Sequence, residues 1–169
     1  MKTIEIYKSL RGDIEAFCNQ LTQVHVNSLE CKKGCCTCCV NLSVYPVEFH
    51  ALKQIAENKN ELKNISWDDN ESCGFLKNNK CQMYEIRPII CMTHGLPILF
   101  LEEESNKYNV SHCELNFIDE TTKFNENNTI PLDQINEKLY LINKRFISEN
   151  NLKLTAEERI NLKELLHES

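Results

Sequence analysis

Glycine is scarce in this chain. Only four of its 169 residues are glycines, and they stand singly at positions 12, 34, 74 and 95. A phosphate-binding loop of the GxGxxG or GxxxxGK[ST] type needs several glycines at fixed close spacing, so neither pattern fits anywhere in the chain. The sequence therefore excludes the common nucleotide-binding motifs.

A long apolar run is also missing. The longest, Leu96–Leu101, is far shorter than the ~20 residues that cross a bilayer. The first segment, Met1–Lys8, contains charged side chains and lacks the apolar stretch of a signal peptide. We therefore expect a cytoplasmic protein with no membrane partner.

Positive charge is in deficit. Nineteen Lys and Arg residues stand against 25 Asp and Glu residues, which gives a formal net charge of -6. A nucleic-acid-binding protein usually carries a basic face, so we expect no nucleic-acid partner. The five histidines also lack the H-x3–5-H spacing of a C2H2 zinc finger.

Cysteine is the residue in excess, with ten copies. Stable disulfides are rare in the cytosol, so these thiols indicate metal binding first and redox chemistry second. Five lie within residues 31–39, and the others are Cys18, Cys73, Cys81, Cys91 and Cys113. The length of the chain favours a single domain that comprises residues 1–169. Within it, we expect a metal-binding region at 28–115 and a helical scaffold at 129–169.

Four of the five clustered cysteines can converge on one site. In a helix, positions 31, 35, 38 and 39 would form one stripe, and Cys36 would point away from it. Gly34 indicates the alternative, a loop whose backbone folds around an ion. Zinc takes four thiolate or imidazole ligands, and iron–sulfur clusters take thiolates, so both arrangements suit either metal.

The second block, Cys73–Cys91, ends in Cys-Gln-Met-Tyr-Glu-Ile-Arg-Pro-Ile-Ile-Cys. With the first block, it resembles the YkgJ-type cysteine-cluster family of zinc- or iron-chelating domains over residues 28–115. That family combines Cys-x2–3-Cys-x2-Cys-Cys with Cys-x-x-Leu and Cys-x-[Ile/Met]-Tyr-Glu-x-Arg-Pro-x-x-Cys. Met92 departs from the pattern, because the family commonly has arginine there. The resemblance implies metal chelation but names neither the metal nor a reaction.

Eight cysteines match the family pattern, and we predict them to be the metal ligands: Cys31, Cys35, Cys38, Cys39, Cys73, Cys81, Cys91 and Cys113. His94 and His112 could each replace a cysteine. Cys18 lies on an apolar helical stripe and is expected to be a core thiol. Arg87, Lys32 and Lys33 could offset the negative charge of bound thiolates, whereas Arg87 and Glu85 could equally form an exposed pair.

The leading function is a cytosolic metal-binding protein that chelates zinc or an iron–sulfur cluster, with no defined reaction. An alternative is an iron–sulfur or dithiol oxidoreductase or electron-transfer protein, with Cys35 and Cys38 as the dithiol. A metal-stabilised interaction adaptor is a further alternative. No catalytic residue stands out. One multinuclear site and two separate sites both remain open, but we expect Cys81 or Cys91 to lie near a first-block sulfur.

The expected fold is mainly α with a small β-hairpin, with an irregular cysteine-rich metal-binding core packed on the helices. Apolar periodicity predicts helices at 10–28, from Pro46, from near Pro131, and from Thr155, where Thr-Ala-Glu-Glu is a capping-box pattern. Residues 96–101 and 108–110 could pair as the two strands of a β-hairpin. Residues 77–80 are expected to form a separate hairpin turn. Residues 57–72 are polar and predict a surface connection.

Overall fold

The computed structural model describes residues 2–58, 65–118 and 122–166. Within these ranges the α-helices are α1 (Lys2–Val24), α2 (Pro46–Asn58), α3 (Ile89–Thr93) and α4 (Leu132–Glu149). Short 3-10 helices cover Tyr84–Ile86 and Leu162–Leu166. The strands are β1 (Ser43–Val44), β2 (Leu76–Lys77), β3 (Lys80–Cys81), β4 (Ile98–Glu102), β5 (Lys107–Ser111), β6 (Ile130–Pro131) and β7 (Ile160–Asn161). The chain is thus mainly helical with small sheets, as predicted.

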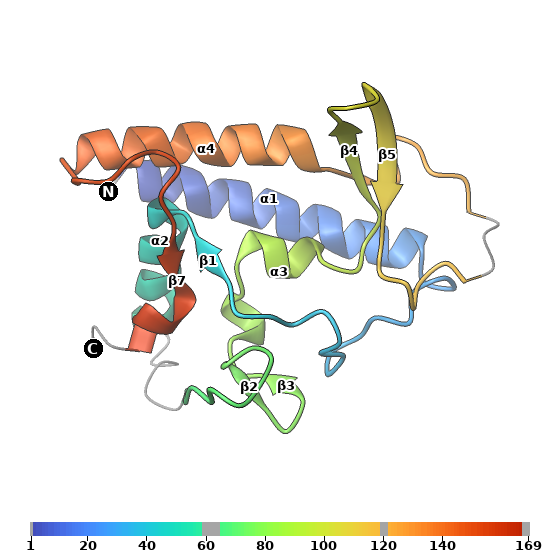
Figure 1. Cartoon of the computed structure of the whole chain (residues 1–169), viewed down its shortest axis with the longest axis horizontal. Helices are drawn as coiled ribbons and strands as arrows, with labels where there is room; N and C mark the ends of the chain where they lie inside the picture. The colour runs from blue at the N-terminus through green and yellow to red at the C-terminus, as the bar shows by residue number, and fades with distance from the viewer. Residues whose placement is uncertain (1, 59–64, 119–121, 167–169) are drawn as a thin grey trace.

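The two long helices, α1 and α4, lie side by side, and α2 packs against both of them (Figure 1). The buried face of α1 repeats every three or four residues, at Ile4, Tyr7, Arg11, Ile14, Cys18 and Leu21. This is the spacing of one helical face. The predicted helix is confirmed, although it begins at Lys2 and ends at Val24. Within the described residues, no helix has both the length and the apolarity to cross a membrane.

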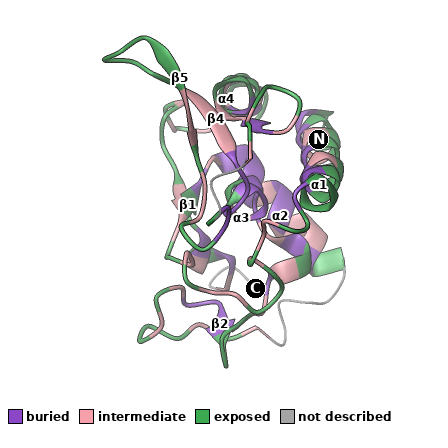
Figure 2. Cartoon of the chain, turned by 90° about the vertical axis from the view of Figure 1, so that its right-hand side faces the viewer, coloured by how far each residue is buried: buried purple, intermediate pink, exposed green. Residues whose placement is uncertain are grey.

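The core consists of two clusters of buried apolar side chains. The first lies between α1, α2, α3 and α4 and includes Tyr7, Leu21, Ala51 and Met92. The second lies between α2, the β2–β3 hairpin and the C-terminal 3-10 helix, and includes Phe49, Phe75, Met83, Ile86 and Leu165. Burying one such large side chain stabilises the fold by ~1.5–3 kcal/mol. Figure 2 shows the buried residues gathered around α2 and α3.

Cysteine does not build this core. Cys18 is buried in the first cluster, as predicted, but the other nine cysteines are only partly buried. Two of these nine, Cys73 and Cys81, pack against the second cluster. The expected cysteine-rich core is therefore not confirmed.

The predicted hairpin is present as β4 and β5, which pair antiparallel from Ile98↔Ser111 to Glu102↔Lys107. Strand β6 joins β4 in parallel. The predicted turn at 77–80 is also confirmed, because β2 and β3 pair around Asn78 (φ 52°) and Asn79 (φ 60°). Two left-handed residues make the turn that best suits a two-residue hairpin loop, and asparagine tolerates that conformation.

The prediction of a last helix from Thr155 is wrong. The backbone amide of Thr155 does donate to the carboxylate of Glu158, which is half of a capping box. The chain then pairs Ile160–Asn161 with Ser43–Val44 and continues as the 3-10 helix Leu162–Leu166. Leu162 and Leu165, which follow this pairing in the chain, are buried in the second core cluster. The local capping pattern at Thr155 gives no sign of this long-range contact.

The polar segment predicted as a surface connection falls partly outside the described residues, at 59–64. Its described parts are the end of α2 and irregular chain from residue 65 onwards. The predicted helix near Pro131 is confirmed as α4, and the helix from Pro46 as α2.

Candidate metal centre

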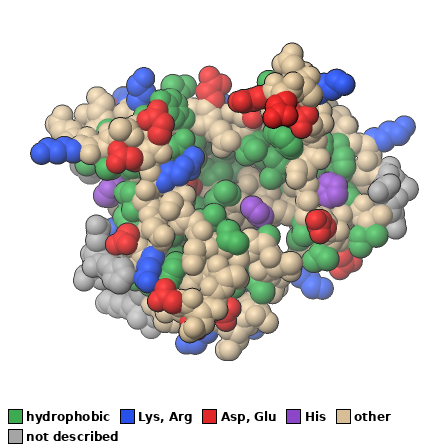
Figure 3. Space-filling view, in the orientation of Figure 1, with side chains coloured by type: hydrophobic (Ala, Val, Ile, Leu, Met, Phe, Trp, Pro, Cys, Tyr) green, Lys and Arg blue, Asp and Glu red, His purple; other side chains and the backbone are tan. Residues whose placement is uncertain are grey.

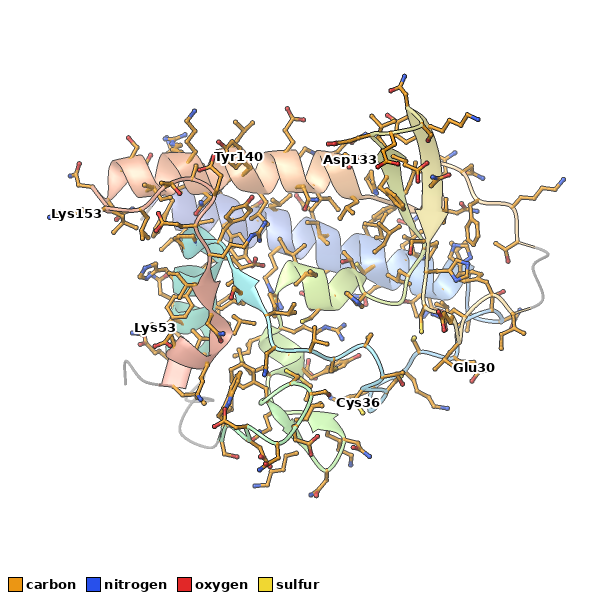
Figure 4. All side chains as sticks on the ribbon, in the orientation of Figure 1. Glu30, Cys36, Lys53, Asp133, Tyr140 and Lys153 are labelled. Atoms are coloured by element: carbon orange, nitrogen blue, oxygen red, sulfur yellow. The ribbon has the colours of Figure 1, made fainter. Side chains whose placement is uncertain are left out.

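The first cysteine block forms a loop rather than a helix. Two successive turns are closed by hydrogen bonds from Cys35 N to Lys32 O (2.9 Å) and from Cys39 N to Cys36 O (3.0 Å). Gly34 has a φ of 101°, a left-handed conformation that favours glycine. Of the two arrangements left open by the spacing, the loop is therefore correct. Figure 4 shows Cys36 on this loop, well separated from the helical layer of α1 and α4.

The later cysteines come from four different places in the fold. Cys73 precedes β2, Cys81 ends β3, Cys91 lies in α3, and Cys113 follows β5. The turn after β5 is closed by Asn116 N donating to Cys113 O at 2.9 Å. These cysteines are far apart in sequence, so the elements around them decide which thiols meet.

One group of neighbouring thiols combines the start of the loop with Cys113. Burial raises the pKa of Cys31 to about 11, a hydrogen bond from Asn116 opposes the rise, and Cys113 and Cys35 add to it. Burial also raises the pKa of Cys38, and negative charge on Cys35 or Cys113 raises it further. Each of these thiols therefore lies near others of the same group: Cys31, Cys35, Cys38 and Cys113.

A second group combines the end of the loop with the second block. Burial raises the pKa of Cys39 to about 12, with further contributions from Cys38, Cys73 and Cys81. Burial also raises the pKa of Cys91 to about 12, and the charges of Cys81, Cys73 and Cys39 add to this. The two cysteine blocks therefore meet at Cys39.

An apolar pocket supports the second group. Cys73, Cys81 and Cys91 line it together with residues 40–42, which directly follow Cys39. The rest of its lining is largely apolar: Trp67, Phe75, Met83, Arg87, Pro88 and Leu162. Figure 3 shows charged side chains mainly around the margin of the face that the loop crosses, with apolar side chains in its middle. Burial beside apolar groups explains why these thiols resist ionisation.

In the first group, one thiol differs from the others. The pKa of Cys35 is lowered, first by hydrogen bonds with the backbone and hydroxyl of Thr37, whose Oγ1 lies 3.8 Å from the Cys35 Sγ. Hydrogen bonds to the charged form favour the thiolate. Cys35 is therefore the thiol in this loop that ionises most readily among those with a shifted pKa.

The thiols do not yet form a coordination shell. In the described ranges, no three Cys, His, Asp or Glu residues are gathered closely enough to hold a metal ion. A tetrahedral zinc site has Zn–S bonds of ~2.3 Å, so chelation requires the loop and its neighbours to draw their sulfurs together.

The basic residues predicted near the thiols have different roles. The Arg87 guanidinium stacks 4.0 Å from the Tyr84 ring centre and lines the pocket with Cys81. Burial raises the pKa of Cys81, and the charge of Arg87 opposes part of that rise. Lys33 Nζ instead pairs with Glu85 Oε1 at 2.8 Å, and both side chains are about two-thirds exposed. Arg87 can thus offset thiolate charge, and Glu85 forms an exposed ion pair with Lys33.

Two buried residues that the sequence analysis missed form hydrogen bonds with the backbone of residues 85–89, which shortly precede Cys91. The Glu48 carboxylate accepts hydrogen bonds from Tyr7 OH (2.6 Å) and from the amide of Ile89 (2.9 Å), at the start of α3. Arg11 donates to Glu85 O at 3.3 Å and Arg87 O at 3.2 Å. Arg11 interrupts the apolar stripe of α1, which was a usable signal; Glu48 has no comparable signal.

Among the described residues, neither alternative ligand, His94 or His112, forms a hydrogen bond with a cysteine sulfur. His94 is exposed at the end of α3. His112 lies 3.0 Å from Cys113 O through Nδ1, and its ring packs against Phe117. Cys36 lies near both Cys38 and Cys39, because its charge adds to the rise in the pKa of each.

The comparison with known families covers the cysteine-rich part of the chain. A family model named CxxCxxCC, with the description "Putative zinc- or iron-chelating domain", matches residues 30–114. No curated protein and no solved structure matches the chain. The match spans slightly more than half of the chain, includes all eight predicted ligands, and leaves Cys18 outside. The chain therefore belongs to the CxxCxxCC family, the YkgJ-type family of zinc- or iron-chelating domains.

Proposed function

We propose that this protein chelates zinc or iron in two four-cysteine sites, each built from both cysteine blocks. The first site comprises Cys31, Cys35, Cys38 and Cys113. The second comprises Cys39, Cys73, Cys81 and Cys91. Membership of the family supports chelation, and the neighbourhood of the thiols supports this division.

The observation that carries the division is that Cys38 and Cys39 have different partners beyond each other. Burial raises the pKa of both thiols. The charges of Cys35 and Cys113 add to the rise at Cys38, whereas those of Cys38 itself, Cys73 and Cys81 add to the rise at Cys39. Adjacent side chains in irregular or extended chain point in different directions, so two neighbouring ions suit this pair better than one. Four thiolates per ion is the usual closed structural zinc site and also the ligand set of a [4Fe–4S] cluster.

Two properties of the chain fit thiolate chelation in the cytoplasm. All ten cysteines are free thiols, as expected in a reducing compartment. The Arg87 guanidinium beside the second group would offset part of the charge of four bound thiolates. When bound, the metal would supply cross-links between the loop, α3 and the chain after β5.

Metal content tests the proposal directly. Protein purified without chelators or added metal is expected to carry about two zinc ions per chain, or one iron–sulfur cluster and one further ion. Elemental analysis gives the stoichiometry, and brown absorbance near ~400 nm separates a cluster from zinc. Zinc and iron together below about a tenth of an equivalent per chain would refute chelation.

A redox role for the Cys35 and Cys38 thiols is a second candidate. It is favoured by the lowered pKa of Cys35, because the thiolate is the form that attacks a disulfide. If this is the function, metal-free protein forms a Cys35–Cys38 disulfide reversibly in a glutathione redox titration, and Cys35→Ser abolishes it. A mass spectrum that shows no such bond under oxidising conditions excludes this candidate.

A further inference from the structure

Asn116 joins three separate segments through one buried side chain. Only 1% of the residue is exposed. Its Oδ1 accepts hydrogen bonds from the amides of Glu30 (2.9 Å) and Cys31 (3.2 Å). Its Nδ2 donates to Gly95 O at 2.6 Å and to the Cys31 Sγ at 3.3 Å. The amide group thus has partners on both its oxygen and its nitrogen, and one partner is a sulfur.

The Cys31 sulfur occupies a closely fitted position. A Cβ atom added at Gly95 would lie 3.0 Å from this sulfur, so the glycine backbone passes directly beside it. Gly95 also has a φ of 92°, which a residue with a side chain rarely adopts. Asn116 holds the Gly95 carbonyl and the Cys31 amide at the same time. The sulfur therefore lies against the Gly95 backbone and the Asn116 amide at the same time.

We infer that Asn116 is a positioning residue for the first proposed site, which fixes Cys31 and donates an N–H to its thiolate when metal is bound. This inference rests on the proposed function. A donor to a charged sulfur forms a stronger hydrogen bond than one to a neutral group. Loss of a residue that orients a metal ligand typically costs ten- to a hundredfold in metal affinity.

Asn143 provides a matched control. It is also a fully buried asparagine, and it joins segments in the same way. Its Oδ1 accepts from the amide of Val47 at 3.2 Å, and its Nδ2 donates to Ala156 O at 2.9 Å. None of these partners is a cysteine. Replacing Asn143 therefore reports the cost of losing a buried amide without touching a ligand.

The variants Asn116→Asp and Asn143→Asp test the inference. Each keeps the size of the side chain and an acceptor oxygen, but removes the donor nitrogen. In Asn116→Asp the new oxygen faces the Cys31 sulfur. Competition with a chromophoric chelator measures both zinc equivalents. We expect Asn116→Asp to weaken one of two zinc equivalents about ten- to a hundredfold, and Asn143→Asp to keep both tight.

A second measurement uses the unmodified protein and so does not depend on whether the variant folds. With ¹¹³Cd bound in place of zinc, a hydrogen bond from the Asn116 side chain to a ligated sulfur is expected to transmit a scalar coupling between the Nδ2 protons and one cadmium. Absence of that coupling in cadmium-loaded protein would overturn the inference, as would zinc binding by Asn116→Asp equal to that of Asn143→Asp.

The outcomes separate the two proposals. If the unmodified protein binds two zinc ions and Asn116→Asp binds them equally well, only the role of Asn116 is wrong. If the unmodified protein binds neither zinc nor cadmium, the proposed chelation is wrong, and the role of Asn116 fails with it.

Discussion

The adjacent residues Cys38 and Cys39 have different neighbours among the later cysteines. Beyond burial, the charge of Cys113 raises the pKa of Cys38, whereas the charges of Cys73 and Cys81, together with that of Cys38, raise the pKa of Cys39. The resemblance to the family pattern was enough to name the eight thiols as candidate ligands. It could not show which later cysteine joins which half of the loop, because that depends on contacts between segments distant in the chain.

Cysteine-to-serine substitution separates ligands from packing residues. Cys81→Ser is expected to lower bound metal and thermal stability together, because metal binding contributes folding free energy. Cys18→Ser is the control, since Cys18 is buried in the first core cluster. It should lower stability and leave the metal content unchanged. Elemental analysis and thermal unfolding of both variants check this. Equal metal loss in both would show that the assignment of Cys18 is wrong.

The raised thiol pKa values predict opposite pH dependences for the two forms of the protein. Metal-free, the folded protein keeps Cys31, Cys39 and Cys91 protonated above the usual thiol pKa. It then binds more protons than the unfolded chain, so its stability falls as the pH rises above about 8.5. Metal-loaded, its ligands are deprotonated, so zinc affinity and stability rise with pH from acidic to neutral values.

Urea unfolding of both forms between pH 6 and pH 10 measures these slopes. A metal-free protein whose stability is flat above about pH 8.5 would contradict the raised pKa values. Zinc affinity that does not change between pH 6 and pH 8 would contradict chelation by thiols.

Among the elements, those with a regular apolar pattern were predictable from the sequence. The face of α1, the start of α4 and the turn at Asn78 and Asn79 each carry a local signal. The segment after Thr155 was not predictable in this way. Its capping hydrogen bond forms as the local pattern suggests, but pairing of β7 with β1 then determines the structure. The candidate site has the same limit, because Asn116 and Cys113 approach the loop through tertiary contacts.

Helix α3 depends on a buried carboxylate of α2. Burial raises the pKa of Glu48, and its hydrogen bonds with Tyr7 and the Ile89 amide oppose this rise. Glu48→Leu removes the acceptor and leaves the hydroxyl and the amide without it. We expect the free energy of unfolding to fall by about 1–3 kcal/mol for each buried group left unsatisfied.

Glu57→Leu, an exposed position on α2, is the matched control and should change stability by less than about 0.5 kcal/mol. Urea unfolding compares the two variants. Equal stability of Glu48→Leu and Glu57→Leu would show that the carboxylate does not hold α3.

In the whole molecule, each thiol group borders a different apolar cluster. Cys31 of the first group lies against the backbone of Gly95, the residue directly before Leu96 of the first cluster. The second group borders the second cluster, into which Cys73 and Cys81 pack. Helix α3 connects the two, because Ile89 and Met92 are in the first cluster while Cys91 lines the pocket of the second group.

The two proposed sites should therefore release metal at different rates. Three ligands of the first site lie on the loop that includes Cys35, whereas three of the second lie on β3, α3 and the turn before β2, against buried side chains. Local opening is easier where few apolar contacts must break. An excess of chromophoric chelator is expected to remove zinc in two phases. Cys35→Ser should abolish the faster phase and Cys81→Ser the slower one. A single phase in the unmodified protein, or loss of both phases in either variant, would show that the thiols form one shared site.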